Sequence, residues 1–202
     1  PRLGDTVGGR FRIEAEGGVG ASGLVFRARD LGDGGEVALK VTYLARAARP
    51  ERAFREARAL ASVRHSAVVR YIAHGYTDAG APFLAMQWIE SETLAQRLAR
   101  GGLTPTESLR LALRVSSGLA ALHDLGIVHR DLKPSNILLA GGVEGACIVD
   151  LGVSRDLNSP TGHTGHGEYV GTPRYMSPEQ IRDPQCVRGA SDVFALGCIL
   201  HE

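Results

Sequence analysis

Short apolar runs separated by turn-forming residues dominate the first part of the chain. The turn at residues 31–35 contains three glycines and an aspartate, which tolerate positive φ and favour a hairpin. A second turn, Asp78-Ala79-Gly80, separates two later apolar runs. We therefore expect antiparallel strands within residues 10–44, 68–76 and 83–89.

A helical periodicity interrupts these strands. Between Pro50 and Val63 apolar residues recur at spacings of three and four, and proline suits the first position of a helix. Beyond Glu92 helical patterns prevail, and a late helix is expected to begin near Asp192. The chain thus changes from mainly strand to mainly helix.

The clearest helix start lies at Thr104. Thr104 is a good N-cap, Pro105 suits the first turn, and Glu107 completes a capping box. This helix is expected to run to about His123. We expect its inner face to comprise Leu109, Leu113, Ser116 or Ser117, and Ala120.

These elements predict an α+β protein with two lobes. A β-rich lobe with one helix is expected over residues 11–86, a connection over 87–92, and a helical lobe over 93–202. Between two such lobes a small ligand is commonly bound. The long polar stretch between Leu151 and Met176 is expected to be a functional loop.

Composition and charge exclude several classes of protein. The chain has 202 residues, is 44% hydrophobic and 22% charged, and carries a net charge of +1, so neither a nucleic-acid-binding nor a membrane-surface protein is indicated. No apolar run reaches the roughly 20 residues of a membrane span, and no signal peptide is evident. The three cysteines form no C-x-x-C pair, which favours a reducing cytoplasm. Because the chain begins at Pro1, we expect it to be cut from a longer protein.

A glycine-rich pattern near the start indicates phosphate binding. Gly18, Gly20, Gly23 and Val25 fit G-x-G-x-x-G-x-V. In dinucleotide-dependent oxidoreductases such glycines join a strand to a helix. Here a turn and a second strand follow, which argues against that class. Glycines in a hairpin let backbone amides approach phosphates closely.

Charged and amide side chains follow the apolar strands. Lys40 ends a buried strand, where it needs a partner or ligand, and Glu56 of the first helix could supply an ion pair. Asp131 and Asn136 stand five residues apart before one short strand, and Asp150 follows another. Oxygen ligands of this kind suit magnesium.

These motifs, in this order, resemble the eukaryotic-like serine/threonine protein kinases, in the form common in bacteria. The resemblance covers essentially the whole chain. It rests on the glycine loop, Lys40, Glu56, the segments 129–136 and 150–152, and the sequences Gly-Thr-Pro-Arg-Tyr-Met-Ser-Pro-Glu at 171–179 and Asp-Val-Phe-Ala-Leu-Gly at 192–197. It implies a bilobal protein-kinase-like fold and transfer of the ATP γ-phosphate to serine or threonine.

The resemblance also implies roles for individual residues. For the ATP phosphates, the resemblance implies that Gly18, Gly20 and Gly23 cover them and that Lys40, held by Glu56, contacts the α- and β-phosphates. For adenine, it implies that the base is sandwiched by Val25, Ala38 and Leu138, with Met86 as gatekeeper and Gln87 and Trp88 in the hinge. In catalysis, Asp131 would orient the substrate hydroxyl, Lys133 would neutralise the γ-phosphoryl group, and Thr172 would support the pair of Asp131 and Lys133. The metal ion, Mg²⁺ or alternatively Mn²⁺, would be held by Asn136 and Asp150.

The same resemblance points to regulation by phosphorylation. Arg130 beside Asp131 is typical of kinases whose activation segment, here 150–179, is ordered by phosphorylation. The favoured acceptors are Thr161 and Thr164, ahead of Ser159, Tyr169 and Thr172. A homodimer would allow one copy to phosphorylate the other.

Some features depart from the family. Leu151 replaces a common phenylalanine, and Gly17 replaces a larger residue over adenine, which would weaken ATP binding. The family continues for several helices after Asp192, so we expect the 202-residue piece alone to be poorly stable or inactive. A pseudokinase used as a scaffold is the rival function, but Lys40, Asp131 and Asp150 are all present, which favours an active enzyme.

Overall fold

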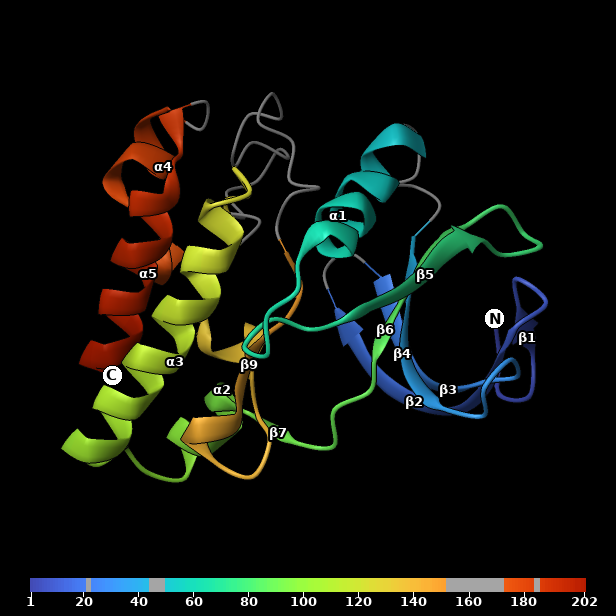
Figure 1. Cartoon of the computed structure of the whole chain (residues 1–202), viewed down its shortest axis with the longest axis horizontal. Coiled ribbons are helices and arrows are strands. Elements are labelled where there is room, and N and C mark those ends of the chain that lie inside the picture. Colours follow the sequence, from blue (N-terminus) through green and yellow to red (C-terminus); the bar gives the residue numbers. More distant parts are fainter. Residues whose placement is uncertain (21–22, 44–49, 152–172, 184–185) are drawn as a thin grey trace, which may run out of the picture. The chain divides into compact units, whose positions relative to one another are not determined.

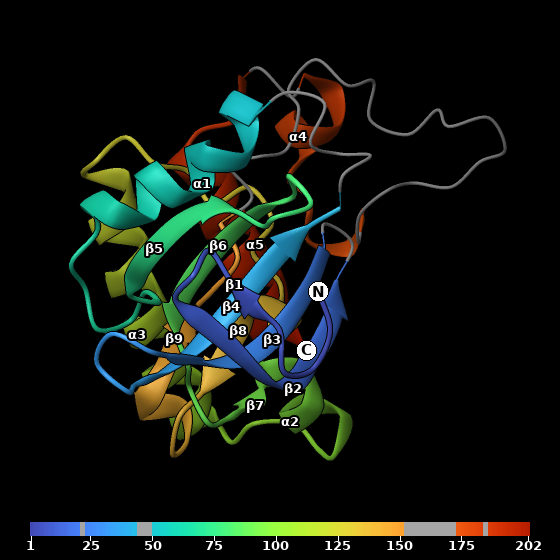
Figure 2. The same cartoon turned by 90° about the vertical axis from the view of Figure 1, so that its right-hand side faces the viewer.

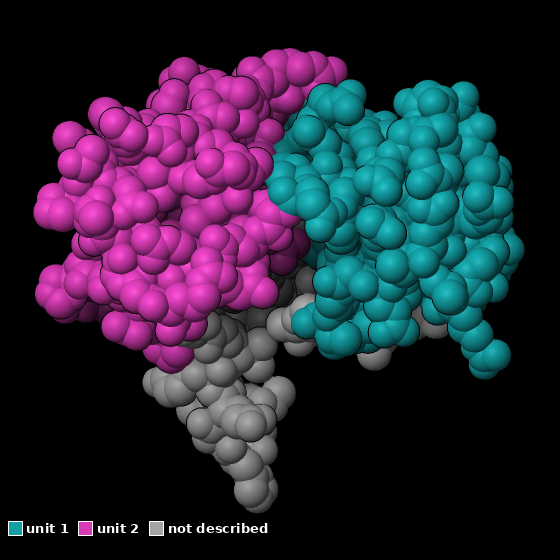
Figure 3. Space-filling model, turned by 90° about the horizontal axis from the view of Figure 1, so that it is seen from below, with its two compact units in different colours: residues 1–62, 69–90 teal, residues 63–68, 91–202 magenta. Residues whose placement is uncertain are grey.

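The chain forms two units, described here from a computed structural model. The structure describes residues 1–20, 23–43, 50–151, 173–183 and 186–202, apart from the side chains of residues 20, 50–53, 55 and 56. Unit 1 comprises residues 1–62 and 69–90, and unit 2 comprises residues 63–68 and 91–202 (Figure 3).

Unit 1 is built on an antiparallel sheet with strand order β1-β2-β3-β4-β6-β5 (Figure 2). Its helix α1 (Pro50–Ser62) packs against β5 and β6. The predicted strands and helix are confirmed, although the strand expected over 68–76 begins only at Tyr71 and the one expected over 83–89 ends at Gln87. The strands are β1 (Thr6–Val7), β2 (Phe11–Gly20), β3 (Gly23–Asp30), β4 (Glu36–Thr42), β5 (Tyr71–Tyr76) and β6 (Pro82–Gln87).

The two faces of this sheet differ in character. Side chains alternate between faces along a strand, and directly paired residues share a face. One face carries the core of unit 1, which includes Phe26, Leu39 and Ala85 in register across three strands. The opposite face carries Val25 paired with Lys40, and Ala38 paired with Met86. The sheet therefore keeps these four residues on the face opposite its own core.

A buried carboxylate fixes one end of the sheet. Asp30 is 1% exposed and accepts hydrogen bonds from Nε and Nη2 of Arg10, at 2.7 and 2.6 Å, and from the Gly32 amide at 2.9 Å. The hydrogen bond from Arg10 is the main cause that lowers the pKa of Asp30 below its ordinary 3.8. The ionised form is thus the one the fold stabilises.

We predict that this carboxylate contributes to acid sensitivity. Because its pKa is lowered in the folded state, its stabilisation is present above about pH 4 and is lost as the pH falls toward the folded-state pKa. Asp30→Asn should therefore flatten the acid limb of thermal stability measured between pH 5 and pH 2. Asp33→Asn, a change in the exposed turn nearby, is the control. Equal acid limbs for wild type and Asp30→Asn would contradict the prediction.

Unit 2 combines helices with a small three-stranded sheet. The helices α3 and α5 lie side by side (Figure 1), and the strand order is β7-β8-β9. Among the helices that the structure describes, none has the length and apolar character needed to cross a membrane. The elements are β7 (Glu92–Thr93), α2 (Leu94–Ala99), α3 (Pro105–His123), η2 (Pro134–Asn136), β8 (Ile137–Leu139), η3 (Val143–Gly145), β9 (Ala146–Ile148), η5 (Pro173–Tyr175), α4 (Pro178–Arg182) and α5 (Gly189–His201).

Helix α3 confirms the predicted start but not the predicted inner face. Thr104 Oγ1 accepts from the Glu107 amide at 3.2 Å, and the Glu107 carboxylate accepts from the Thr104 amide at 2.8 Å, as in a capping box. Leu109 and Leu113, however, are 62% and 64% exposed, so the predicted inner face was wrong. The buried residues are Leu111, Val115, Gly118, Leu119 and Leu122. The helix carries two apolar stripes, and packing selects the one formed by these residues.

Candidate active site

A buried aspartate holds the backbone of the segment 129–136. Asp192, at the start of α5, is 1% exposed. Its Oδ2 accepts from the His129 amide and its Oδ1 from the Arg130 amide, both at 2.8 Å, and His123 Nε2 donates to Oδ2 at 2.8 Å. Arg130 has φ of 67°, which is unusual for a residue with a side chain. The two amide hydrogen bonds stabilise this turn immediately before Asp131.

His129 links this segment to the strand β9. It is fully buried, its Nε2 donates to the Val149 carbonyl at 3.1 Å, and its Nδ1 accepts from the Asp131 amide at 3.3 Å. One donor and one acceptor define a neutral imidazole. Burial lowers the pKa of His129 below its ordinary 6.5, which agrees with this assignment.

We predict a pH dependence of stability from His129. As the pH falls below about 6.5, the unfolded chain binds a proton that the folded chain does not, so stability decreases toward the lower, folded-state pKa. His129→Gln should be less stable at pH 8 but should lose less further stability between pH 7 and pH 5. The melting temperature across this range measures the slope. His201→Gln, on an exposed position of α5, should keep the wild-type slope; an unchanged slope in His129→Gln would contradict the prediction.

Four polar residues predicted for catalysis and metal binding lie along this part of unit 2. Lys133 Nζ lies 3.0 Å from Asp131 Oδ2, and Asn136 Nδ2 donates to the Asp131 carbonyl at 2.9 Å. The Val149 amide donates to the Asn136 carbonyl at 3.0 Å, and Asp150 follows directly with φ of 62°. Pairing of β8 with β9 therefore brings the segment containing Asp131, Lys133 and Asn136 next to Asp150.

Asn136 and Asp150 offer oxygen atoms of the kind that magnesium prefers as ligands. The amide nitrogen of Asn136 is committed to the Asp131 carbonyl, so its amide oxygen is the side-chain atom that can bind a cation. Within the described part of the chain no cluster of three or more His, Cys, Asp or Glu side chains could hold a metal. Magnesium often uses one or two carboxylates together with substrate phosphates. Asn136 and Asp150 fit an ion of that type.

The predicted nucleotide-binding residues of unit 1 lie on the sheet and at its end. Lys40 in β4 is 6% exposed and lies opposite Val25 of β3. Gln87 ends β6 and is exposed, and Trp88 Nε1 donates to Glu90 at 2.9 Å. Gly18 and Gly20 lie in β2, Ala38 in β4 and Met86 in β6, whereas Leu138 lies in β8 of unit 2.

Gly23 has a structural reason to be glycine besides any contact with phosphate. A Cβ added at Gly23 would lie 2.1 Å from the Val41 carbonyl oxygen, far inside van der Waals contact. The close approach of β3 and β4 at this point therefore requires glycine.

Several predicted residues are only partly described. Glu56 lies in α1, but its side chain is outside the described part of the structure. Thr172 lies outside the described residues, as do the candidate phosphorylation sites Ser159, Thr161, Thr164 and Tyr169.

The sequence did not reveal the supporting contacts of the site. The acceptor role of Asp192 was not predicted, nor were the contribution of His123 and the hydrogen bond from Gln180 Nε2 to the Arg130 carbonyl at 2.9 Å. An acidic residue in the first turn of an otherwise apolar helix was the available signal at Asp192. No local pattern shows which backbone amides it accepts from.

The fold of the two units and the arrangement around Asp131 define a protein kinase domain. Residues 11–202 match the protein kinase domain family, and the chain belongs to that family. The resemblance to serine/threonine protein kinases and the predicted α+β kinase fold are thereby confirmed. Members of this family use ATP and protein substrates.

Named relatives and a solved structure agree with this assignment. The chain is 36% identical over 200 residues to serine/threonine-protein kinase pkn2 of Myxococcus xanthus, covering 96% of this chain and 24% of the relative. It is 34% identical over 207 residues to the probable serine/threonine-protein kinase PknB of Corynebacterium glutamicum, covering 97% and 31%. The Mycobacterium tuberculosis PknI kinase domain matches with a TM-score of 0.77 and 26% identity, over 99% of this chain and 75% of that one. The chain thus spans about a quarter to a third of these two curated relatives.

Proposed function

We propose that this chain transfers the γ-phosphoryl group of ATP to serine or threonine hydroxyls of proteins. The observation that carries the proposal is the contact between Asp131 and Lys133, 3.0 Å apart, on a segment held by Asp192. A carboxylate beside an ammonium group can orient a hydroxyl while the cation faces the negative charge of the phosphoryl group. The two relatives above are named as serine/threonine-protein kinases, which supports serine and threonine as the acceptor residues.

The chain's residues would act mainly by positioning and by electrostatics. Asp131 accepts a hydrogen bond from the attacking hydroxyl and directs its lone pair toward the γ-phosphorus. Lys133 stabilises the negative charge that the transferred oxygens carry. Lys40 would hold the α- and β-phosphates, with Glu56 as its partner. Val25, Ala38, Met86, Gln87, Trp88 and Leu138 would surround adenine, and Gly18, Gly20 and Gly23 would cover the phosphates.

Asn136 and Asp150 would hold magnesium, through the amide oxygen of the first and the carboxylate of the second. When bound there, Mg²⁺ would supply positive charge that offsets the negative charge of the ATP phosphates. The fixed amide of Asn136 limits the reorganisation that ion binding requires. Mn²⁺, which also accepts oxygen ligands, would be an alternative ion.

We further propose control by phosphorylation of the segment 150–179. Among the described residues, Arg130 Nε is buried without a hydrogen-bond partner, which favours an anion as its missing partner. A phosphate on Thr161 or Thr164 would provide that anion, and Thr172 would support Asp131 and Lys133. In a homodimer, one copy would phosphorylate this segment of the other. The domain would act in the cytoplasm, where ATP is abundant, and would serve as a signalling module.

The acceptor class can be tested with three matched peptides. The full-length protein is incubated with ATP and peptides that differ only in a serine, threonine or tyrosine acceptor, with Mg²⁺, with Mn²⁺ or with excess EDTA. We expect metal-dependent phosphorylation of the serine and threonine peptides alone. Phosphorylation of tyrosine alone, or ATP binding without transfer to any peptide, would contradict the proposal; the second result would favour a pseudokinase.

A further inference from the structure

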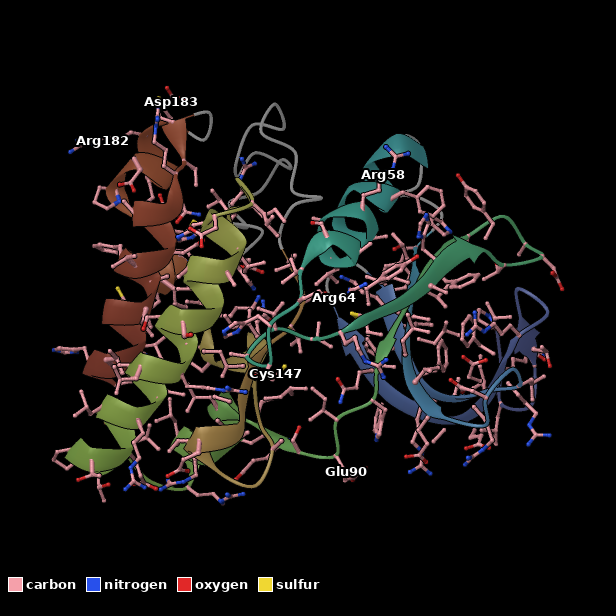
Figure 4. All side chains as sticks on the ribbon, viewed as in Figure 1. Arg58, Arg64, Glu90, Cys147, Arg182 and Asp183 are labelled. Carbon is pink, nitrogen blue, oxygen red and sulfur yellow. The ribbon has the colours of Figure 1, made fainter. Side chains whose placement is uncertain are left out.

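A short segment between α1 and β5 belongs to the other unit. Residues 63–68, here called the tether segment, are part of unit 2, although α1 before them and β5 after them are part of unit 1 (Figure 3). Val63, Ala67 and Val68 of the tether segment are each at most 5% exposed. Figure 4 labels Arg64 in the tether segment and Cys147 in β9, both within unit 2.

Arg114 of α3 makes two hydrogen bonds to the tether segment and one to β9. Its Nη2 donates to the Ser66 carbonyl at 2.7 Å and its Nη1 to Ser66 Oγ at 2.9 Å, while its Nε donates to the Ala146 carbonyl at 3.1 Å. One guanidinium therefore joins α3, the tether segment and the first residue of β9. A planar group with several donors in fixed directions suits such a junction, and lysine could not reproduce all three hydrogen bonds.

Neighbouring positions of α3 add to this attachment. Ser117 Oγ and His65 Nε2 share a hydrogen bond of 3.2 Å. A Cβ added at Gly118 would lie 3.1 Å from the Ala67 carbonyl oxygen, so glycine permits the close approach. The Ile148 amide of β9 donates to that carbonyl at 2.8 Å. The tether segment is thus held by a helix face and by a strand.

The tether segment follows α1 directly in the chain. Ser62 ends α1 and Val63 begins the tether segment, so the last turn of α1 is covalently joined to backbone that unit 2 holds. Glu56 precedes Ser62 by six residues, less than two turns of helix. We propose that Arg114 is a positioning residue that, through the tether segment, restrains the end of α1 and so favours the placement of Glu56 needed for phosphoryl transfer. This inference rests on the proposed kinase function.

The matched control is Arg110, one turn earlier on the same helix. Arg110 forms an ion pair with Glu144 in which both side chains are more than half exposed, and such pairs contribute little. In the full-length protein, Arg114→Ala is expected to lower kcat about tenfold, because it removes charge-assisted hydrogen bonds to the tether segment. Arg110→Ala should change kcat less than about twofold. The kcat of Arg114→Lys should lie between the values of wild type and Arg114→Ala. If the alanine variant does not fold, the lysine variant is compared with Arg110→Ala in its place.

A double-mutant cycle separates positioning from general stability. If Arg114 acts through Glu56, Arg114→Ala should lower kcat about tenfold in the wild-type background but less than about twofold in a Glu56→Gln background. A purely structural role would give the same factor in both. Equal factors, or equal kcat for Arg114→Ala and Arg110→Ala, would overturn the inference.

Hydrogen exchange gives a readout that does not depend on catalysis. Arg114→Ala should speed amide exchange in residues 50–68 about tenfold and leave 129–136 unchanged. Unchanged exchange in 50–68, or an equal increase in both regions, would overturn the inference. If the wild-type protein transfers no phosphate at all, the proposed function fails, and the exchange pattern still decides whether Arg114 restrains α1.

Discussion

Replacing Asp131 with asparagine is expected to lower kcat about a thousandfold while leaving the melting temperature nearly unchanged. The change keeps the size of the side chain but removes the negative charge that orients the substrate hydroxyl. Lys133, 3.0 Å away, loses its ionic partner but stays partly exposed, so the fold tolerates the change. Steady-state rates on a serine peptide and a thermal melt measure the two quantities.

Asp124→Asn is the control for this prediction. Asp124 is an exposed residue at the end of α3, in the same unit, and undergoes the same chemical change. It should retain wild-type kcat within about twofold, as is usual for exposed substitutions. A kcat for Asp131→Asn within tenfold of wild type would show that another group orients the hydroxyl.

Replacing Asp192 with alanine is expected to lower the free energy of unfolding by about 3–4 kcal/mol, because buried amides lose their acceptor. The His129 and Arg130 amides and His123 Nε2 all donate to this carboxylate. Without it, the left-handed turn at Arg130 would lose its support. We therefore expect kcat to fall in parallel with stability, unlike the selective effect at Asp131.

Chemical unfolding followed by circular dichroism, together with peptide kinetics, checks this prediction. Asp124→Ala serves as the control and should change stability by less than about 0.5 kcal/mol. A variant lacking Asp192 that unfolds at the wild-type denaturant concentration would contradict the assigned role. Normal kcat with reduced stability would show that Asp192 supports the fold but not the catalytic segment.

Local chemistry made the start of α3 predictable but left its orientation open. Thr104 and Glu107 satisfy each other's backbone groups within four residues, so the capping box depends on nothing distant. The choice between the stripe with Leu109 and the stripe with Leu111 depends on what packs against the helix. In the fold Leu111 is buried and Leu109 is exposed. Sequence periodicity alone could not decide between two apolar faces.

The candidate site, too, was only partly predictable from the sequence. Asp131, Lys133 and Asn136 lie within six residues, so the sequence alone grouped them, and the fold places Lys133 and Asn136 in contact with Asp131. Asp192 lies more than sixty residues from Arg130, whose amide it accepts, and Arg114 lies forty-eight from Ser66. Such contacts depend on helix packing, so the sequence does not show which distant atoms will meet.

The most direct test of the proposed kinase activity is to follow which phosphate of ATP is transferred. The full-length protein and Asp131→Asn are each incubated with Mg²⁺, a generic basic substrate protein, and ATP labelled at either the γ- or the α-phosphate. Our account predicts transfer from the γ-position only, onto serine and threonine, and only by the wild-type protein. Label from the α-position, or equal transfer by Asp131→Asn, would contradict the assignment of this chain as a phosphoryl-transferring kinase that uses Asp131.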